Sequence, residues 1–206
     1  MCYRFGMLRV GLTGGIATGK STVSRLFVEC GARLIDADVL ARDVVAPGRP
    51  AFQQIVEAFG RVMLRQDGTL DRDRLGKVVF GDPAQLEKLN TIIHPHVAVE
   101  QEQRSREIAG KDPQAVIVYD AALLIETSAH KRMDKIIVVI ANEQAQFSRL
   151  KARNHLSADE AKRRIAAQIP LAEKVKVADY VIDGTLPMEP LRAEIRRIYD
   201  ELKRLA

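Results

Sequence analysis

Residues 14–21 read Gly-Gly-Ile-Ala-Thr-Gly-Lys-Ser, which is a complete G-x-x-x-x-G-K-S phosphate-binding motif. Alternating apolar residues at positions 8–12 predict a strand before the motif, and residues 22–27 predict a helix after it. Glycines let the backbone turn tightly and approach a polyphosphate closely, while the helix N-terminus offers N–H groups and a partial positive charge. The alternative is a glycine-rich turn that only reverses the chain. The order strand, loop and helix favours a site for a nucleoside triphosphate.

The motif also assigns individual roles. We expect Lys20 to reach the β- and γ-phosphates and the Ser21 hydroxyl to bind Mg²⁺. ATP is therefore the expected phosphate donor, with Mg²⁺ as its cofactor. The predicted ATP-binding residues are those of the loop and of the first helical turn: Gly15, Ile16, Ala17, Thr18, Gly19, Lys20, Ser21 and Thr22.

The composition is that of a globular domain: 206 residues, 47% hydrophobic and 29% charged. We expect a single domain over residues 7–206, with residues 1–6 as an N-terminal extension. No apolar run approaches the length of a membrane span, and the first residues are too short and weakly apolar for a secretory signal. Cys2 and Cys30 have no metal or redox spacing. These features favour a cytoplasmic protein without a membrane partner, as a monomer or small homo-oligomer.

The net charge of +5 raises the question of nucleic-acid binding. Basic and acidic residues are interleaved along the whole chain, and no aromatic-rich basic strand accompanies them. A positive balance suits an enzyme with polyphosphorylated substrates equally well. We therefore expect small-molecule partners and no nucleic acid.

Four further β-branched segments predict strands, and helical patterns separate them. The fold class indicated is α/β, with a mainly parallel five-stranded sheet covered by helices on both faces. Ligands bind at the carboxyl ends of such strands, so acidic residues there are candidates for the site. The segments, with the aspartates that follow three of them, are residues 33–35 before Asp36, 116–119 before Asp120, 135–140, and 180–182 before Asp183.

Three of the acidic residues at this rim are candidates for chemistry. Asp120 occupies the position of a Walker-B-like acid that holds magnesium, although an exposed loop aspartate is the alternative. Asp36 and Asp38 would project from one side if the chain stays extended after the strand, and strand-end capping is the alternative for them. One of them could position or deprotonate an acceptor hydroxyl.

Between residues 41 and 110 no buried strand is evident, so this range is expected to be a helical subdomain inserted into the sheet. His94 and Pro95 lie at the junction of two predicted helices, and the residues alone favour a structural role for His94. The predicted helices of the chain outside the phosphate loop are 50–59, 72–79, 83–93, 97–108, one that starts at the capping box 157–160 and ends before Pro170, and 189–205.

Arg149 and Arg153 lie four residues apart and would share one helix face. In a kinase, a helical lid over residues 145–172 could bring them to the transferring phosphate and exclude water. Arg153 is the stronger candidate for a catalytic role. A solvated basic helix is the alternative.

From Met7 onward and over almost its whole length, the chain resembles dephospho-CoA kinases. The resemblance implies a three-layer P-loop kinase fold with a helical acceptor-binding insertion and a helical lid. The matching pieces are Leu12–Ile16 with Gly19–Thr22, Asp36-Ala37-Asp38 with Ala41-Arg42, Asn90 with His94-Pro95 and Val97, Leu123-Leu124 with Glu126, Arg149 with Arg153, Gln168, Lys174, and Ala178–Asp183.

The resemblance further implies phosphorylation of the ribose 3′-hydroxyl of dephospho-CoA by ATP. It makes Asp38 the expected general base and sets Asp36 close to the metal and the acceptor. Arg149 and Arg153 belong to the lid side, with Arg149 at the ATP. The helical block 41–110 becomes the acceptor-binding subdomain. The residues implied to contact the acceptor are Asp36, Arg42, His94 and Leu123.

The chain departs from the family pattern at three positions. Ala122 replaces a proline and Ile125 a phenylalanine in the segment after the third strand. Gly184 stands where the family usually has asparagine. The loop lysine and the aspartate pair are unaffected, so an active enzyme is expected.

The residues alone leave one close competitor open and argue against a second class, the regulatory GTPases. The phosphate loop reports the donor and not the acceptor, so a nucleoside monophosphate or shikimate-type kinase is the closest competitor. A regulatory GTPase would carry an N-K-x-D motif after a later strand. Residues 141–144 read Ala-Asn-Glu-Gln, which lacks the Lys and Asp.

Overall fold

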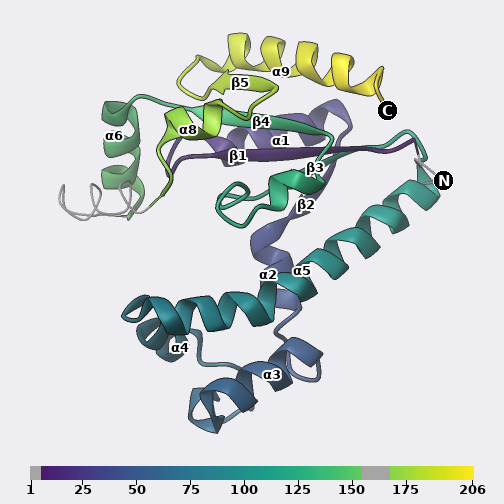
Figure 1. The fold of residues 1–206 in the computed structure, drawn as a ribbon. Coiled ribbons are helices and arrows are strands. Elements are labelled where there is room, and N and C mark those ends of the chain that lie inside the picture. The colour runs from purple at the N-terminus through teal and green to yellow at the C-terminus, as the bar shows by residue number, and fades with distance from the viewer. Residues whose placement is uncertain (1–5, 155–167) are drawn as a thin grey trace. The chain divides into compact units, whose positions relative to one another are not determined.

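The structure, a computed structural model, describes residues 6–154 and 168–206. Figure 1 presents its elements along the chain. In order they are β1 (Leu8–Gly14), α1 (Lys20–Cys30), β2 (Arg33–Asp36), α2 (Ala37–Asp43), α3 (Pro50–Phe59), η1 (Arg61–Met63), α4 (Arg72–Phe80), α5 (Pro83–Lys111), β3 (Val116–Asp120), η2 (Ala129–Arg132), β4 (Lys135–Ile140), α6 (Glu143–Asn154), α8 (Leu171–Val175), β5 (Tyr180–Asp183) and α9 (Met188–Lys203).

The five strands form one sheet in the order β2-β3-β1-β4-β5. β1 pairs in parallel with both β3 and β4, and β4 pairs in parallel with β5. This confirms the predicted α/β class and the five predicted strands. The register sets Leu12 of β1 opposite Asp120 of β3 and Ile137 of β4, so the strands adjoining β1 end near the phosphate loop.

Alternation along β1 divides its side chains between the two faces of the sheet. Val10 and Leu12 face a core that also contains apolar residues of α1 and α9. On the other face, the backbone at Gly11 lies against Leu124 and Met133 of the segment after β3. The predicted apolar stripe of the C-terminal helix is confirmed, since its four residues are buried: Leu191, Ile195, Ile198 and Leu202.

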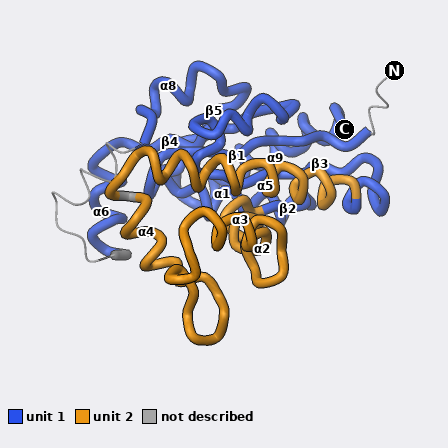
Figure 2. Tube along the Cα trace, turned by 60° about the horizontal axis from the view of Figure 1, so that its bottom comes forward, with its two compact units in different colours: residues 1–35, 107–206 blue, residues 36–106 orange. Residues whose placement is uncertain are grey.

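The chain divides into two compact units, coloured separately in Figure 2. One contains residues 1–35 and 107–206, and the other contains residues 36–106. The second unit has its own apolar core, in which Ile55 of α3 and Val79 of α4 are buried. No helix within the described residues is both long and apolar enough to cross a membrane.

The prediction of separate helices over 83–93 and 97–108 was wrong, because α5 is one helix with Pro95 inside it. A proline in a helix interior removes one backbone hydrogen bond and bends the helix, and α5 is visibly bent in Figure 1. Contacts on both sides of Pro95 retain the helix. Before it, Lys88 donates to the carbonyl of Ala58 at 2.8 Å. After it, Arg104 pairs with Asp43 at 2.7 Å.

The end of β5 contains a carboxylate whose pKa is lowered by hydrogen bonds. Asp183 Oδ1 accepts from the Thr185 hydroxyl at 2.6 Å and from the Thr185 N–H at 2.8 Å. The hydroxyl is the largest cause of the low pKa, followed by the N–H, and the positive charge of Arg149 adds to it. This turn leads directly into Gly184, which adjoins the phosphate loop.

The pKa of Asp183 is lower in the folded protein than in the unfolded chain. Its carboxylate therefore stabilises the folded protein at pH values above the pKa of the unfolded chain. This stabilisation is lost as the pH falls through the folded pKa. We therefore expect Thr185→Val to reduce the free energy of unfolding at pH 7. The difference from wild type should narrow as the pH falls below about 4, the ordinary carboxyl value. Urea unfolding at several pH values measures it. A difference that stays constant down to pH 3 would contradict this account.

Candidate active site

The phosphate loop joins β1 to α1 with an unusual backbone. Gly19, the N-cap of α1, has φ +101°, and Ala17 has φ +58°, a left-handed conformation that residues with a Cβ rarely adopt. Within the loop, Thr18 Oγ1 donates to the carbonyl of Gly15 at 2.9 Å. α1 then begins at Lys20 with its N-terminus at the loop. This is the geometry in which helix N–H groups and dipole attract a phosphate.

Lys20 and Asp120 form an ion pair at the start of α1. The register of β1 and β3 brings them together, because Asp120 ends β3 beside Leu12, shortly before the loop. Ser24, one turn after Lys20 on α1, also donates its hydroxyl hydrogen to Asp120. Both Asp120 and Ser24 are buried. Sequence reasoning missed Ser24, although its i+4 spacing from Lys20 could have indicated it.

The donor atoms near the loop fit a magnesium ion. Ser21 offers a hydroxyl in the first turn of α1, and Asp120 offers carboxylate oxygens, both of them hard ligands. Mg²⁺ typically takes one or two carboxylates and completes its shell with phosphate oxygens and water. Among the described residues no group of three His, Cys, Asp or Glu side chains could hold a metal ion.

Arg149 of α6 lies against the phosphate loop. Its guanidinium donates to the carbonyl of Ala17 at 3.1 Å and to the carbonyl of Gly184 at 2.7 Å. It therefore bridges the loop to the segment after β5. The side chain of Arg153 and residues 155–167 of the predicted lid lie outside the described residues.

Two glutamine side chains hold Ile16 of the loop. The Ile16 N–H donates to Gln168 Oε1 at 2.8 Å, and the Ile16 carbonyl accepts from Gln146 Nε2 at 2.7 Å. Sequence reasoning missed Gln146, and Gln168 entered only through the family resemblance. Both line a cavity of about 810 Å³ beside Gly15, together with apolar residues such as Phe147 and Leu171.

The described lining of this cavity contains no lysine or arginine. Apolar walls with a few amide groups suit an uncharged part of a ligand better than a phosphate. Glu143, at the start of α6, is the charged residue of the described lining.

Asp36 and Asp38 belong to the second unit, and the condition for both to project from one side, an extended chain between them, is not met. β2 ends at Asp36 and α2 begins at Ala37. Asp36 Oδ1 caps α2 by accepting the N–H groups of Asp38 and Val39 at 2.8 and 3.1 Å. This cap starts the helix at once, so Asp38 lies in its first turn with an exposed side chain.

The remaining acceptor candidates are exposed. Arg42 lies in the last turn of α2, and its carbonyl accepts a hydrogen bond from Arg72 at 3.3 Å. His94 lies within α5, directly before Pro95. In the first unit, Leu123 is 50% exposed, which is unusual for a leucine in an otherwise packed segment.

Leu123 belongs to a segment after β3 that a buried lysine holds. Lys174 of α8 is fully buried, donates to the carbonyl of Ala122 at 2.9 Å and pairs with Glu126 at 2.8 Å. Thr13 of β1 donates to the same carbonyl at 3.1 Å. The segment that carries Leu123 is thereby fixed to β1 and α8.

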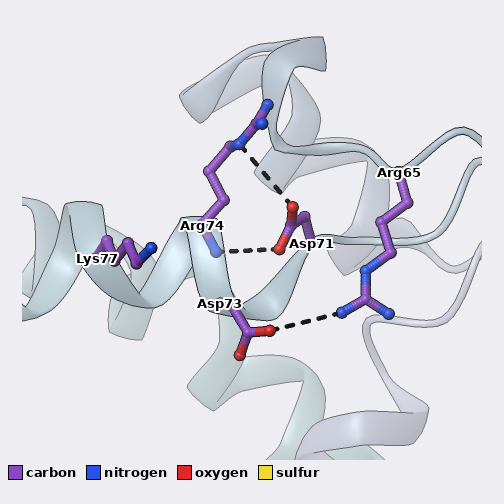
Figure 3. A pocket seen from close by; sticks show the side chains of 5 residues that line it. All are labelled: Arg65, Asp71, Asp73, Arg74 and Lys77. Carbon is purple, nitrogen blue, oxygen red and sulfur yellow. Dashed lines mark hydrogen bonds and ion pairs between the residues drawn. The ribbon is translucent and has the colours of Figure 1, made fainter.

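A second cavity, of about 420 Å³, lies in the second unit and has charged walls (Figure 3). Arg74 pairs with Asp71, and Arg65 pairs with Asp73, each at 3.9 Å. Asp71 also caps α4 through the Arg74 N–H, which is the largest cause of its lowered pKa. The walls are therefore largely neutralised by their own ion pairs.

The parallel sheet and the phosphate loop with its Lys20–Asp120 pair define a P-loop kinase fold. A model of the family described as dephospho-CoA kinase matches residues 8–187. The dephospho-CoA kinase of Carboxydothermus hydrogenoformans is 46% identical over 94% of this chain and 94% of its own length. That of Streptomyces avermitilis is 44% identical over 95% and 94%. The chain belongs to the dephospho-CoA kinase family.

Solved structures share the fold. TT1252 from Thermus thermophilus superposes with a TM-score of 0.79 at 30% identity, covering 95% of this chain and 97% of that one. The dephospho-CoA kinase of Campylobacter jejuni has a TM-score of 0.64 at 24% identity, covering 96% and 98%. Shikimate kinase from Aquifex aeolicus, at 19% identity and a TM-score of 0.51 over 94% and 96%, shares the fold alone.

Gly184 provides a test of how closely the loop is packed. A Cβ at this position would lie 2.0 Å from the carbonyl oxygen of Thr18, so any side chain must displace the loop. We expect Gly184→Ala to destabilise the protein by about 1–3 kcal/mol, as overpacking does, and to weaken ATP binding. Urea unfolding and calorimetric titration with Mg-ATP measure the two effects.

Gly110→Ala is the matched control. Gly110 lies in α5 with open space around its missing Cβ, so alanine there should be neutral or stabilise by up to about 1 kcal/mol. Equal losses at the two positions would mean that the contact between Gly184 and Thr18 does not shape the loop.

Proposed function

We propose that this chain transfers the γ-phosphoryl group of Mg-ATP to the ribose 3′-hydroxyl of dephospho-CoA, giving CoA and ADP in the last step of coenzyme A biosynthesis. The observation that carries the proposal is family membership over residues 8–187 together with an intact phosphate loop. Both substrates are small molecules, and the cytoplasm is the compartment that this reaction suits.

On the donor side, the loop N–H groups and the α1 N-terminus bind the phosphates of ATP. Lys20 neutralises charge on the β- and γ-phosphates, an electrostatic contribution that preorganised cations make to phosphoryl transfer. Ser21 and Asp120 would hold Mg²⁺, which supplies further neutralisation of the phosphate oxygens when bound. Arg149 adds a positive charge beside the loop.

On the acceptor side, Asp38 accepts the proton of the 3′-hydroxyl as that oxygen attacks the γ-phosphorus. Asp36 caps α2 and so fixes the helix turn that carries Asp38. In this proposal Asp36 also lies close to the metal and the acceptor. Arg42, His94 and Leu123 contact dephospho-CoA in this proposal. All except Leu123 belong to unit 36–106, which we propose as the acceptor-binding part of the chain.

The acceptor can be tested directly. We expect purified protein with Mg-ATP to release ADP rapidly only when dephospho-CoA is added, with a product heavier by one phosphate. AMP and shikimate serve as competing acceptors, because nucleoside monophosphate and shikimate-type kinases share the donor site. ADP release with one of these, and none with dephospho-CoA, would mean that the donor site is correct and the acceptor is not. Coupled ADP detection and mass spectrometry provide the readouts.

Two substitutions test the residue roles. Asp38→Asn should lower kcat by about 10²–10⁴-fold, the range for loss of a general base, while the affinity for Mg-ATP changes little. Lys20→Ala should lower turnover by about 10²-fold or more. Asp73→Asn is the matched control, since Asp73 also lies in the first turn of a short helix. Near-wild-type kcat in Asp38→Asn would remove Asp38 from the mechanism.

A further inference from the structure

Three side chains hold successive peptide groups of the phosphate loop from the side of α6. Gln168 accepts the N–H of Ile16, Gln146 donates to the carbonyl of Ile16, and Arg149 donates to the carbonyl of Ala17. The distances are 2.8, 2.7 and 3.1 Å, all within the normal range for hydrogen bonds. All three contacts are made to backbone N–H or C=O groups of the loop, not to its side chains.

These contacts fix the two peptide planes on either side of Ala17. Gln146 orients the plane between Ile16 and Ala17, and Arg149 orients the plane between Ala17 and Thr18. The φ and ψ angles of Ala17 follow from those two planes. Ala17 has φ +58°, an unfavourable conformation for a residue with a Cβ, which persists only where the surroundings impose it.

The same contacts direct the loop N–H groups. A trans peptide points its C=O and N–H in opposite directions. With the Ile16 carbonyl turned to Gln146 on α6, the Ala17 N–H points away from α6. A peptide flip at Ala17 would relieve the left-handed conformation and also reverse this N–H.

We propose that Gln146 and Gln168 are positioning residues that hold the phosphate loop in its anion-binding conformation through their hydrogen bonds to Ile16. Gln146 is buried, and its amide would lose its hydrogen bond to Ile16 if the loop rearranged. This cost opposes the flip that Ala17 would otherwise favour. The inference rests on the proposed function only in taking an adenine nucleotide as the ligand.

The test is calorimetric titration of Mg-ADP without any acceptor. Gln146→Leu and Gln168→Leu should each raise the Kd for Mg-ADP about tenfold, the order expected for losing a buried hydrogen bond. Gln144→Leu makes the same chemical change at an exposed position of α6 and should leave Kd within about twofold. In steady state, KM for ATP should rise while KM for dephospho-CoA stays constant.

A second substitution distinguishes a role of Gln146 in holding the Ala17 conformation from a role in general packing. Ala17→Gly removes the Cβ that disfavours the left-handed conformation, so in the Gln146→Leu background it should recover about threefold of the lost affinity. Lower affinity in the double variant than in Gln146→Leu would overturn the proposal, as would equal Kd values for Gln146→Leu and Gln144→Leu. If Gln146→Leu does not fold, Gln146→Ala with Ala17→Gly carries the same comparison. Mg-ADP binding is independent of the acceptor, so failure of dephospho-CoA turnover would leave this test intact.

Discussion

In a phosphate-binding loop the backbone N–H groups are the atoms that bind the ligand, so other parts of the protein must hold that backbone from the opposite side. The loop has few side chains of its own to do this. Thr18 bonds within the loop, and the remaining support comes from residues far away in sequence, on α6 and at Gln168 and Gly184. The Thr18 carbonyl lies where a Cβ of residue 184 would be. The segment after β5 therefore packs directly against the loop backbone and limits its movement on that side.

The parallel sheet supplies the second part of this arrangement. Its register sets Asp120 beside Leu12, and α1 leaves the loop so that Lys20 and Ser24 both reach that carboxylate. The contacts of Asp120 with the Lys20 ammonium and the Ser24 hydroxyl therefore both depend on the pairing of β1 with β3. A shift of register by one residue would turn Asp120 to the opposite face of the sheet and break both contacts. The backbone pairing of β1 with β3 therefore determines the position of the Asp120 carboxylate relative to Lys20 and Ser24, in addition to holding the sheet together.

The sequence predicted the elements whose signals are local. The helix over residues 50–59 was predicted with the observed bounds, because Pro50 starts it and Gly60 ends it. Pro95 was misread as a break, since the contacts that keep α5 continuous come from α2 and from the end of α3. Capping, the alternative considered for Asp36, is what the structure shows. Gln146 could not be predicted, because its partner Ile16 lies 130 residues away and only the folded sheet brings them together.

The segment after β3 shows how a departure from a family pattern can be accommodated. A proline at position 122 would restrict the backbone there, and this chain has alanine instead. The carbonyl of Ala122 accepts hydrogen bonds from both Lys174 and Thr13, and Glu126 pairs with the same lysine. A fully buried ammonium group is costly unless it is paired, so Lys174 holds both partners firmly. Tertiary contacts therefore fix the backbone where a proline ring would have restricted it, and Leu123 remains exposed on a rigid segment directly beyond the carboxylate of Asp120.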